Sequence, residues 1–227
     1  MHSVGIRDEI KDRVIARRGK VHLFDRFDPA RTAVIVIDMQ ATFCAEGAPA
    51  EVPLSRGLVG PINRLNGLVR QAGGHVIWIN HANDNTGGRS DWDGFYNRFV
   101  ADDVRAQTIA SMAPGSPGQE IWEGLEVAEK DLRLIKNRYS ALIPGSSALE
   151  RVLRSLGVDT LLITGTKTNV CCESTARDAM MMDFKVVMVE DATATLSDDE
   201  HRAALETMIQ QFGDVMTVDE IAERLPS

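Results

Sequence analysis

The amino-acid sequence predicts an α/β protein in which a parallel β-sheet is covered by helices on both faces. Six short runs rich in Val, Ile and Leu recur along the chain of 227 residues. Near-continuous apolar content of this kind is typical of strands that are buried on both faces. Segments with helical patterning separate the runs, and this alternation favours parallel pairing. The length suits one well-cored domain.

The expected elements follow in order along the chain. The six strands are predicted at residues 33–38, 75–80, 132–136, 160–164, 185–190 and 214–218. Helical patterning predicts helices over residues 57–71, 119–129, 146–156, 171–183 and 198–211. No internal repeat and no interdomain linker interrupts the series.

Two regions lie outside this alternation. Ile6, Ile10 and Val14 are spaced i, i+4, i+8, which predicts a helix in an N-terminal arm of residues 1–30, ahead of a main domain at residues 31–227. This arm packs either on its own domain or on another subunit. Residues 82–117 are rich in Asn, Asp, Gly and Trp, and a long insertion after a strand is often a lid or a pocket wall.

The composition limits the kinds of partner that we expect this protein to bind. A net charge of −8 disfavours nucleic acid as the main ligand. No apolar run reaches the roughly 18 residues of a membrane span, and the N-terminus lacks the apolar core of a signal peptide. Three cysteines make a poor disulfide framework, so we expect a reducing, cytoplasmic setting.

Three reactive side chains fall at the carboxyl ends of predicted strands, where ligands bind in open α/β sheets. Asp38 ends the first strand, Lys136 ends the third, and Cys171 follows the fourth. Each has an ordinary alternative: the aspartate could cap a turn, and the lysine could extend its stem from a strand end to solvent. Their coincidence at one edge of the sheet favours a reactive site, with Lys136 holding Asp38 ionised.

The adjacent cysteines are separated by helical phase. In a helix from about residue 170, Cys172 shares an apolar stripe with Ala176, Ala179 and Met180, so it should pack in the core. Cys171 then faces the cleft. The helix start should lower the pKa of its thiol.

Other residues of this region have local roles. Thr168 or Asn169 is the expected N-cap. Gly165 allows a sharp exit from the strand, and the following turn presents backbone N–H groups that can stabilise an oxyanion. Cys44 is interpreted as a packed thiol.

Taken together, these residues resemble the isochorismatase-like cysteine hydrolase superfamily. The similarity runs from about residue 32 to the C-terminus through the motifs AVIVIDMQATFC, IKNRYSAL, ITGTKTNVCCESTARDA and VVMVEDATAT. The resemblance implies a three-layer α/β/α sandwich with a six-stranded parallel sheet of order 3-2-1-4-5-6. It implies an Asp38–Lys136–Cys171 triad, a cis peptide bond between Thr166 and Lys167, and an oxyanion hole formed by the backbone N–H groups of Lys167 and Cys171. It also implies a homo-oligomer, either dimer or tetramer.

Differences between this sequence and the branches of the superfamily limit the reactions that we expect. Nicotinamidases carry a metal site with an Asp-x-His pattern after the second strand, whereas here INHANDNTGGRSDWDG has His81 as its only histidine. We therefore expect no metal and no cofactor. Isochorismatases that cleave a vinyl ether typically lack the thiol at the position of Cys171. The string TNVCCESTARD is most similar to the ureidoacrylate and N-carbamoyl amidohydrolase branch, although the loop after the second strand does not match that branch.

The predicted function is a cysteine-dependent amidohydrolase for a small molecule. It would cleave a small carboxamide, ureido or N-carbamoyl substrate through a thioester, with release of ammonia or amine. The alternatives are a vinyl-ether hydrolase that uses Asp38 as acid, and a non-catalytic scaffold that retains the fold. Residues that could contact substrate, each with ordinary packing as an alternative, are Gln40, Phe43, Asn80, His81, Trp92, Tyr139 and Asn169.

Overall fold

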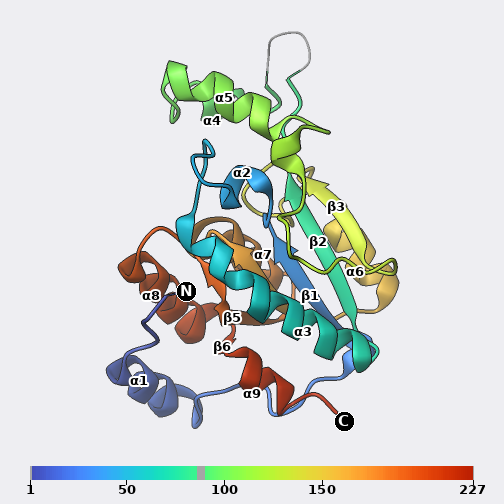
Figure 1. The fold of residues 1–227 in the computed structure, drawn as a ribbon. Coiled ribbons are helices and arrows are strands. Elements are labelled where there is room, and N and C mark those ends of the chain that lie inside the picture. Colours follow the sequence, from blue (N-terminus) through green and yellow to red (C-terminus); the bar gives the residue numbers. More distant parts are fainter. Residues whose placement is uncertain (1, 86–89, 227) are drawn as a thin grey trace.

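The predicted sheet is confirmed. The structure is a computed structural model that describes residues 2–85 and 90–226, and its six strands are ordered β3-β2-β1-β4-β5-β6 (Figure 1). Every neighbouring pair is parallel. The strands are β1 (Thr32–Ile37), β2 (His75–His81), β3 (Leu132–Lys136), β4 (Thr160–Thr166), β5 (Lys185–Ala194) and β6 (Asp214–Met216). Three of them run further than expected, since β2 reaches His81, β4 reaches Thr166 and β5 reaches Ala194.

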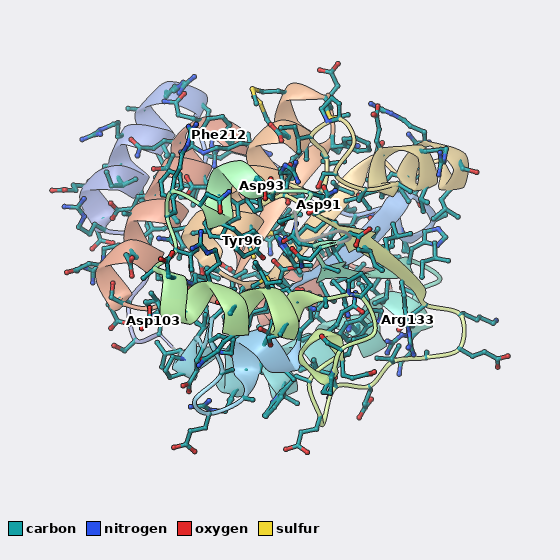
Figure 2. All side chains as sticks on the ribbon, turned by 90° about the horizontal axis from the view of Figure 1, so that it is seen from above. Asp91, Asp93, Tyr96, Asp103, Arg133 and Phe212 are labelled. Carbon is teal, nitrogen blue, oxygen red and sulfur yellow. The ribbon has the colours of Figure 1, made fainter. Side chains whose placement is uncertain are left out.

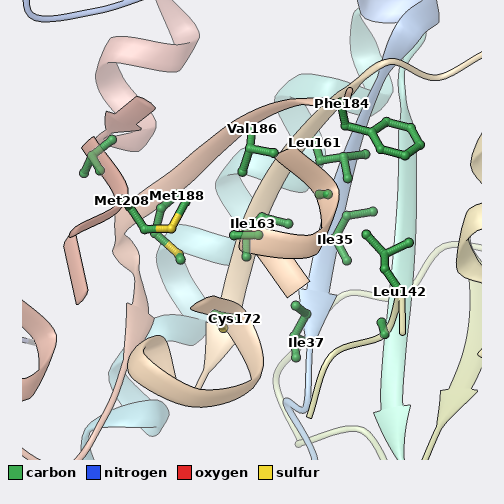
Figure 3. Close-up of a cluster of buried hydrophobic side chains, with 14 of the residues drawn as sticks. Ile35, Ile37, Leu142, Leu161, Ile163, Cys172, Phe184, Val186, Met188 and Met208 are labelled. Atoms are coloured by element: carbon green, nitrogen blue, oxygen red, sulfur yellow. The ribbon is translucent and has the colours of Figure 1, made fainter. Parts of the chain in front are cut away.

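Helices cover both faces of the sheet because side chains alternate along each strand. Ile35, Ile37 and Ile163 belong to a buried cluster on one face, drawn in Figure 3, and Val34 and Val36 belong to the cluster on the other. The first face is covered by α1 (Asp8–Arg18), α6 (Leu149–Leu156), α7 (Glu173–Met181) and α8 (Asp198–Thr207). The second is covered by α3 (Val59–Gln71) and α9 (Val218–Ala222). The result is the expected three-layer sandwich.

The predicted helix over residues 119–129 is wrong. The chain there forms a short 3₁₀ turn at Pro117–Gln119 and then an extended segment. Trp122 N donates to Met39 O over 2.8 Å, and Ile121 forms an antiparallel bridge with Gln40. The positive φ of 81° at Gly124 is incompatible with a continuing helix. The apolar residues of the segment still pack on the second cluster, so their burial, not a helix, explains the pattern.

The N-terminal arm folds onto its own chain. Ile6, Ile10 and Val14 are buried in the first cluster, and the latter two lie on α1. Arg7, just before α1, makes a two-pronged ion pair with Glu206 on α8, with distances of 2.8 and 2.7 Å. Association of whole subunits stays a prediction.

The insertion after β2 lies beyond the carboxyl ends of the strands (Figure 1). It contains α4 (Asp93–Tyr96) and α5 (Asp102–Met112), and residues 86–89 of it lie outside the described part of the chain. The short α2 (Ala41–Cys44) follows β1 on the same side. In the view from above, Asp91, Asp93 and Tyr96 lie over the middle of the molecule (Figure 2). The insertion therefore covers the edge where the reactive residues were expected.

Helices long and apolar enough to cross a membrane are absent from the described residues.

Candidate active site

Asp38, Lys136 and Cys171 meet at the carboxyl edge of the sheet. Lys136 Nζ lies 2.8 Å from Asp38 Oδ2 and 3.5 Å from Cys171 Sγ. The side chains of Asp38 and Lys136 are fully buried. Asp38 directly follows β1 and has a φ of 55°, a left-handed conformation that is uncommon outside glycine.

Lys136 spans the strand that separates it from Asp38. It is the last residue of β3 and pairs in register with His81, the last residue of β2. Its ammonium also lies 3.0 Å from His81 Nδ1 and 3.1 Å from the carbonyl oxygen of Arg138. Because four acceptors surround three ammonium protons, the lysine is held firmly between β1 and the turn after β4.

His81 is neutral and bonded at both ring nitrogens. Its Nδ1 accepts from the Lys136 ammonium, so Nε2 carries the proton and donates to Asn83 Oδ1 over 2.8 Å. Burial, together with the Lys136 charge, holds the pKa of His81 well below its usual range. Within residues 2–85 and 90–226, no cluster of His, Cys, Asp and Glu side chains has the arrangement of a metal site.

The resting thiol of Cys171 keeps its proton. Burial raises the pKa of this thiol and the Asp38 charge raises it further, against the opposing effect of Lys136. The expected lowering at a helix start is wrong, because desolvation of a fully buried thiolate outweighs the helix dipole. Formation of a thiolate at Cys171 would therefore require a base, and the nearest carboxylate whose charge acts on the thiol is that of Asp38.

The charge of the Asp38–Lys136 pair is balanced inside the protein. Burial raises the pKa of Asp38, although the Lys136 charge and hydrogen bond act in the opposite direction. Burial lowers the pKa of Lys136, but the negative charge of Asp38 and the hydrogen bonds to Asp38 and Cys171 act in the opposite direction, and the net direction is upward. The lysine thus stays cationic beside the carboxylate.

The turn that carries Cys171 is π-helical rather than α-helical. It spans Thr168–Cys172 and precedes α7. Cys172 is fully buried, with Sγ 3.7 Å from the carbonyl oxygen of Thr164, as the core assignment requires. Ala176 and Ala179 are buried as the stripe predicts, but the stripe is wrong for Met180, which lies at its margin and is 41% exposed.

The expected N-cap is wrong. No side chain caps this turn. Thr168 Oγ1 bonds His201 Nδ1 over 2.9 Å instead, and Asn169 Oδ1 accepts from Thr195 Oγ1 over 2.6 Å. The Thr168 side chain is thus bonded to α8, and the Asn169 side chain to the residue that follows β5.

Gly165 brings β4 close to β1 just before the turn. Its φ is 105°, and a Cβ at this position would lie 2.0 Å from the carbonyl oxygen of Ile37. Only glycine fits here. The next peptide bond, between Thr166 and Lys167, is cis.

A cavity of about 240 Å³ opens beside Cys171. Lys167, Val170 and Cys171 line this cavity, and most of the remaining lining residues are apolar. The other lining residues are Phe43, Pro49, Ala50, His81, Phe95, Val100, Val104, Thr108, Met112 and Tyr139.

Three of the seven predicted substrate contacts line this cavity, namely Phe43, His81 and Tyr139. The other four do not. Gln40 connects the segment after β1 to β2. Its side-chain oxygen accepts from the backbone N–H of His81 over 2.6 Å, and its side-chain nitrogen donates to the backbone carbonyl of His81 over 3.0 Å. Asn80 donates to Gln119 O, and Asn169 is bonded to Thr195. The Trp92 ring stacks between the rings of His81 and Phe95, which both line the cavity.

Sequence reasoning missed most of the apolar wall. Phe95, Val100, Val104, Thr108 and Met112 come from the insertion, which was expected to form a wall but without named residues. No motif marks these positions. Cys44 is a packed thiol as expected, and burial raises its pKa to about 11.

Comparison with known proteins agrees with this geometry. A family model described as the isochorismatase domain matches residues 32–220. The chain is 31% identical over 196 residues to an Arabidopsis thaliana protein named probable inactive nicotinamidase, which covers 86% of this chain and 96% of that protein.

Solved structures show the same fold. A cysteine hydrolase from Pseudomonas syringae pv. phaseolicola has a TM-score of 0.78 and 32% identity, over 88% of this chain and 94% of that one. N-carbamoylsarcosine amidase from Thermoplasma acidophilum has a TM-score of 0.66 and 23% identity, over 83% and 97% of the two chains, and this likeness is one of fold. On the matched domain, the strand order and these relatives, the chain belongs to the family of isochorismatase-like hydrolases.

Proposed function

We propose that this protein is a cysteine amidohydrolase that cleaves a small carboxamide, ureido or N-carbamoyl substrate. The observation that carries the proposal is the contact of Lys136 with both Asp38 and Cys171, where Cys171 also lines a cavity. A nucleophile, a base within reach and a third group that orients the base are what covalent catalysis needs.

Acylation begins at sulfur. Asp38 accepts the thiol proton as Cys171 Sγ forms a bond to the substrate carbonyl carbon. The carbonyl oxygen becomes an oxyanion. In this mechanism the backbone N–H groups of Lys167 and Cys171 donate hydrogen bonds to it. The C–N bond then breaks, Asp38 returns the proton to the departing nitrogen, and ammonia or amine leaves a thioester on Cys171.

Deacylation uses the same base. Asp38 takes a proton from water, the resulting hydroxide attacks the thioester, and the proton returns to Cys171 as the C–S bond breaks. Lys136 lies 2.8 Å from the carboxylate and favours the anionic form of Asp38 before each half-reaction begins. The chain supplies every group that these steps use, so the reaction as written needs no cofactor.

The cavity suits a small acyl group with an apolar body. Phe43, Phe95, Val104 and Met112 present apolar surface to its interior, and burial of such surface stabilises a bound apolar group by about 25 cal/mol per Å². His81 also lines the cavity and contacts Lys136, whose ammonium lies 3.5 Å from the sulfur, so the amide of the substrate would lie at this end.

Ammonia release from a panel of uncharged amides, ureides and N-carbamoyl compounds tests the proposal. We expect turnover of at least one class and, after acid quenching, a mass increase on Cys171 equal to the acyl group. Folded protein that releases no ammonia or amine from any class, and shows no acyl adduct, would instead support the non-catalytic scaffold. Turnover of a vinyl ether that survives blocking of Cys171 with iodoacetamide would support the second alternative.

A further inference from the structure

The N-terminal segment reaches the turn that carries Cys171, although it precedes the matched domain, which begins at residue 32. The His2 side chain is only 2% exposed. Its ring stacks on that of His201 with centroids 4.0 Å apart and planes 13° from parallel. His201 in turn contacts Thr168, the first residue of the π-helical turn.

Hydrogen bonds fix the protonation of both rings. Thr195 N donates to His2 Nε2 over 3.0 Å, so His2 Nδ1 carries the proton and donates to Asp198 Oδ1 over 2.7 Å. His201 donates to the carbonyl oxygen of Glu190, which leaves its Nδ1 to accept from the Thr168 hydroxyl. Burial, followed by the effect of His2, lowers the pKa of His201 to about 4, in agreement with a neutral ring.

The segment is anchored at its other end as well. The Arg7 guanidinium pairs with Glu206 on α8, and Arg7 N donates to the same carboxylate over 3.2 Å. Ser3 Oγ donates to Asp198 Oδ2 over 2.9 Å. Residues 2–7, which we name the strap, are therefore held along α8 from its N-terminal turn to Glu206.

We propose that the strap positions the nucleophile turn, with His2 and His201 as positioning residues for the hydrolytic reaction. The inference rests on the proposed function. The His2 ring stacks on the face of the His201 ring, and His201 Nδ1 accepts a hydrogen bond from the hydroxyl of Thr168. Thr168 directly follows Lys167, whose backbone N–H is the proposed oxyanion donor, and lies three residues before Cys171. A misplaced donor loses transition-state stabilisation while substrate binding in the cavity is retained.

Conservative and disruptive substitutions can test the contacts of Thr168 and His201 separately. Thr168→Val removes the hydroxyl at nearly constant shape, whereas Thr168→Ser keeps it. His201→Asn keeps an acceptor near Nδ1, whereas His201→Ala removes it. Arg13→Ala is the matched control in the arm, because it removes a bond from α1 to Gln210 that does not reach the turn.

The test measures kcat and KM for the best amide of the panel, together with hydrogen–deuterium exchange of the peptide that contains residues 166–172. We expect His2→Ala, His201→Ala and Thr168→Val to lower kcat about tenfold with KM within about twofold, which is about 1.4 kcal/mol in the barrier. Exchange in this peptide should rise. Thr168→Ser and Arg13→Ala should resemble the wild type in both measurements, and His201→Asn, which keeps the acceptor but loses the ring stack, should fall between His201→Ala and the wild type.

Wild-type kcat and exchange in Thr168→Val and His2→Ala would overturn the proposal, as would equal losses in Arg13→Ala. If the wild-type protein hydrolyses no amide, the proposed function fails, and the exchange measurement alone decides whether the strap orders the turn.

Discussion

Lys136 Nζ lies 2.8 Å from Asp38 Oδ2 although β2 separates their strands in the sheet. The lysine stem crosses the end of β2 beside His81, and the two charges are completely buried. A buried carboxylate without a cation is far costlier than the pair, because its desolvation is left uncompensated. Stability and activity should therefore both depend on this contact.

The first prediction concerns the buried pair. Lys136→Met should lower the free energy of unfolding by about 3–5 kcal/mol, since Asp38 is left buried and unpaired. The double variant Asp38→Asn/Lys136→Met should regain much of this loss. Urea unfolding gives both values, and Lys20→Met, which removes an exposed pair with Asp25, is the control with little expected change. Additive losses in the double variant would contradict the account.

The second prediction concerns the base. Asp38→Asn should lower kcat by about 10²–10⁴-fold with the fold retained, because the amide cannot accept the thiol proton. Asparagine tolerates the left-handed backbone at this position. Asp183→Asn is matched to it, since Asp183 has a φ of 66° but lies outside the site. Ammonia release by Asp38→Asn at the wild-type rate would remove Asp38 from the mechanism.

The third prediction is a pH dependence. Asp38 must be ionised to act as base, and burial raises its pKa above the ordinary 3.8 despite Lys136. As pH falls through this raised pKa, the carboxyl becomes protonated and kcat/KM should fall in proportion. The acid limb of the pH–rate profile should thus lie above 3.8, with circular dichroism confirming that the protein stays folded. A profile that is flat down to that value would contradict the assignment.

The fourth prediction concerns the approach of β4 to β1. Gly165→Ala should destabilise the protein by about 3 kcal/mol or more, because the new Cβ combines a strained φ with overlap of the Ile37 carbonyl. Gly73→Ala has a positive φ of 89° but open space around it, so it measures chiefly the backbone cost of about 1–2 kcal/mol. Equal losses of unfolding free energy in the two variants would show that the overlap is relieved.

The sheet and the three polar residues at its edge could be predicted because both depend on local sequence patterns. Runs of Val, Ile and Leu identify strands buried on both faces, and strand ends place Asp38, Lys136 and Cys171 on one edge. The distance across β2 could not be predicted, since it depends on how far a lysine stem extends over the neighbouring strand.

Other features depend on tertiary contacts that no local pattern encodes. Residues 119–129 have spaced apolar side chains but bury them in an extended segment that bonds to Met39 and bridges Gln40. The turn at Thr168–Cys172 is π-helical, which the helical pattern of the sequence does not distinguish from an α-helical start. The cavity wall comes from α4 and α5, whose contribution depends on how the insertion folds back over the sheet.

The central claim is that Cys171, and not its neighbour, is the nucleophile. The most direct measurement is ammonia release by Cys171→Ala and Cys172→Ala, each compared with wild type at matched folded concentration. We predict that Cys171→Ala has no detectable turnover and forms no acyl adduct. Cys172→Ala should keep its turnover and lose stability, since it only removes a packed sulfur from the core. A folded Cys172→Ala protein without activity, beside an active Cys171→Ala protein, would contradict the account.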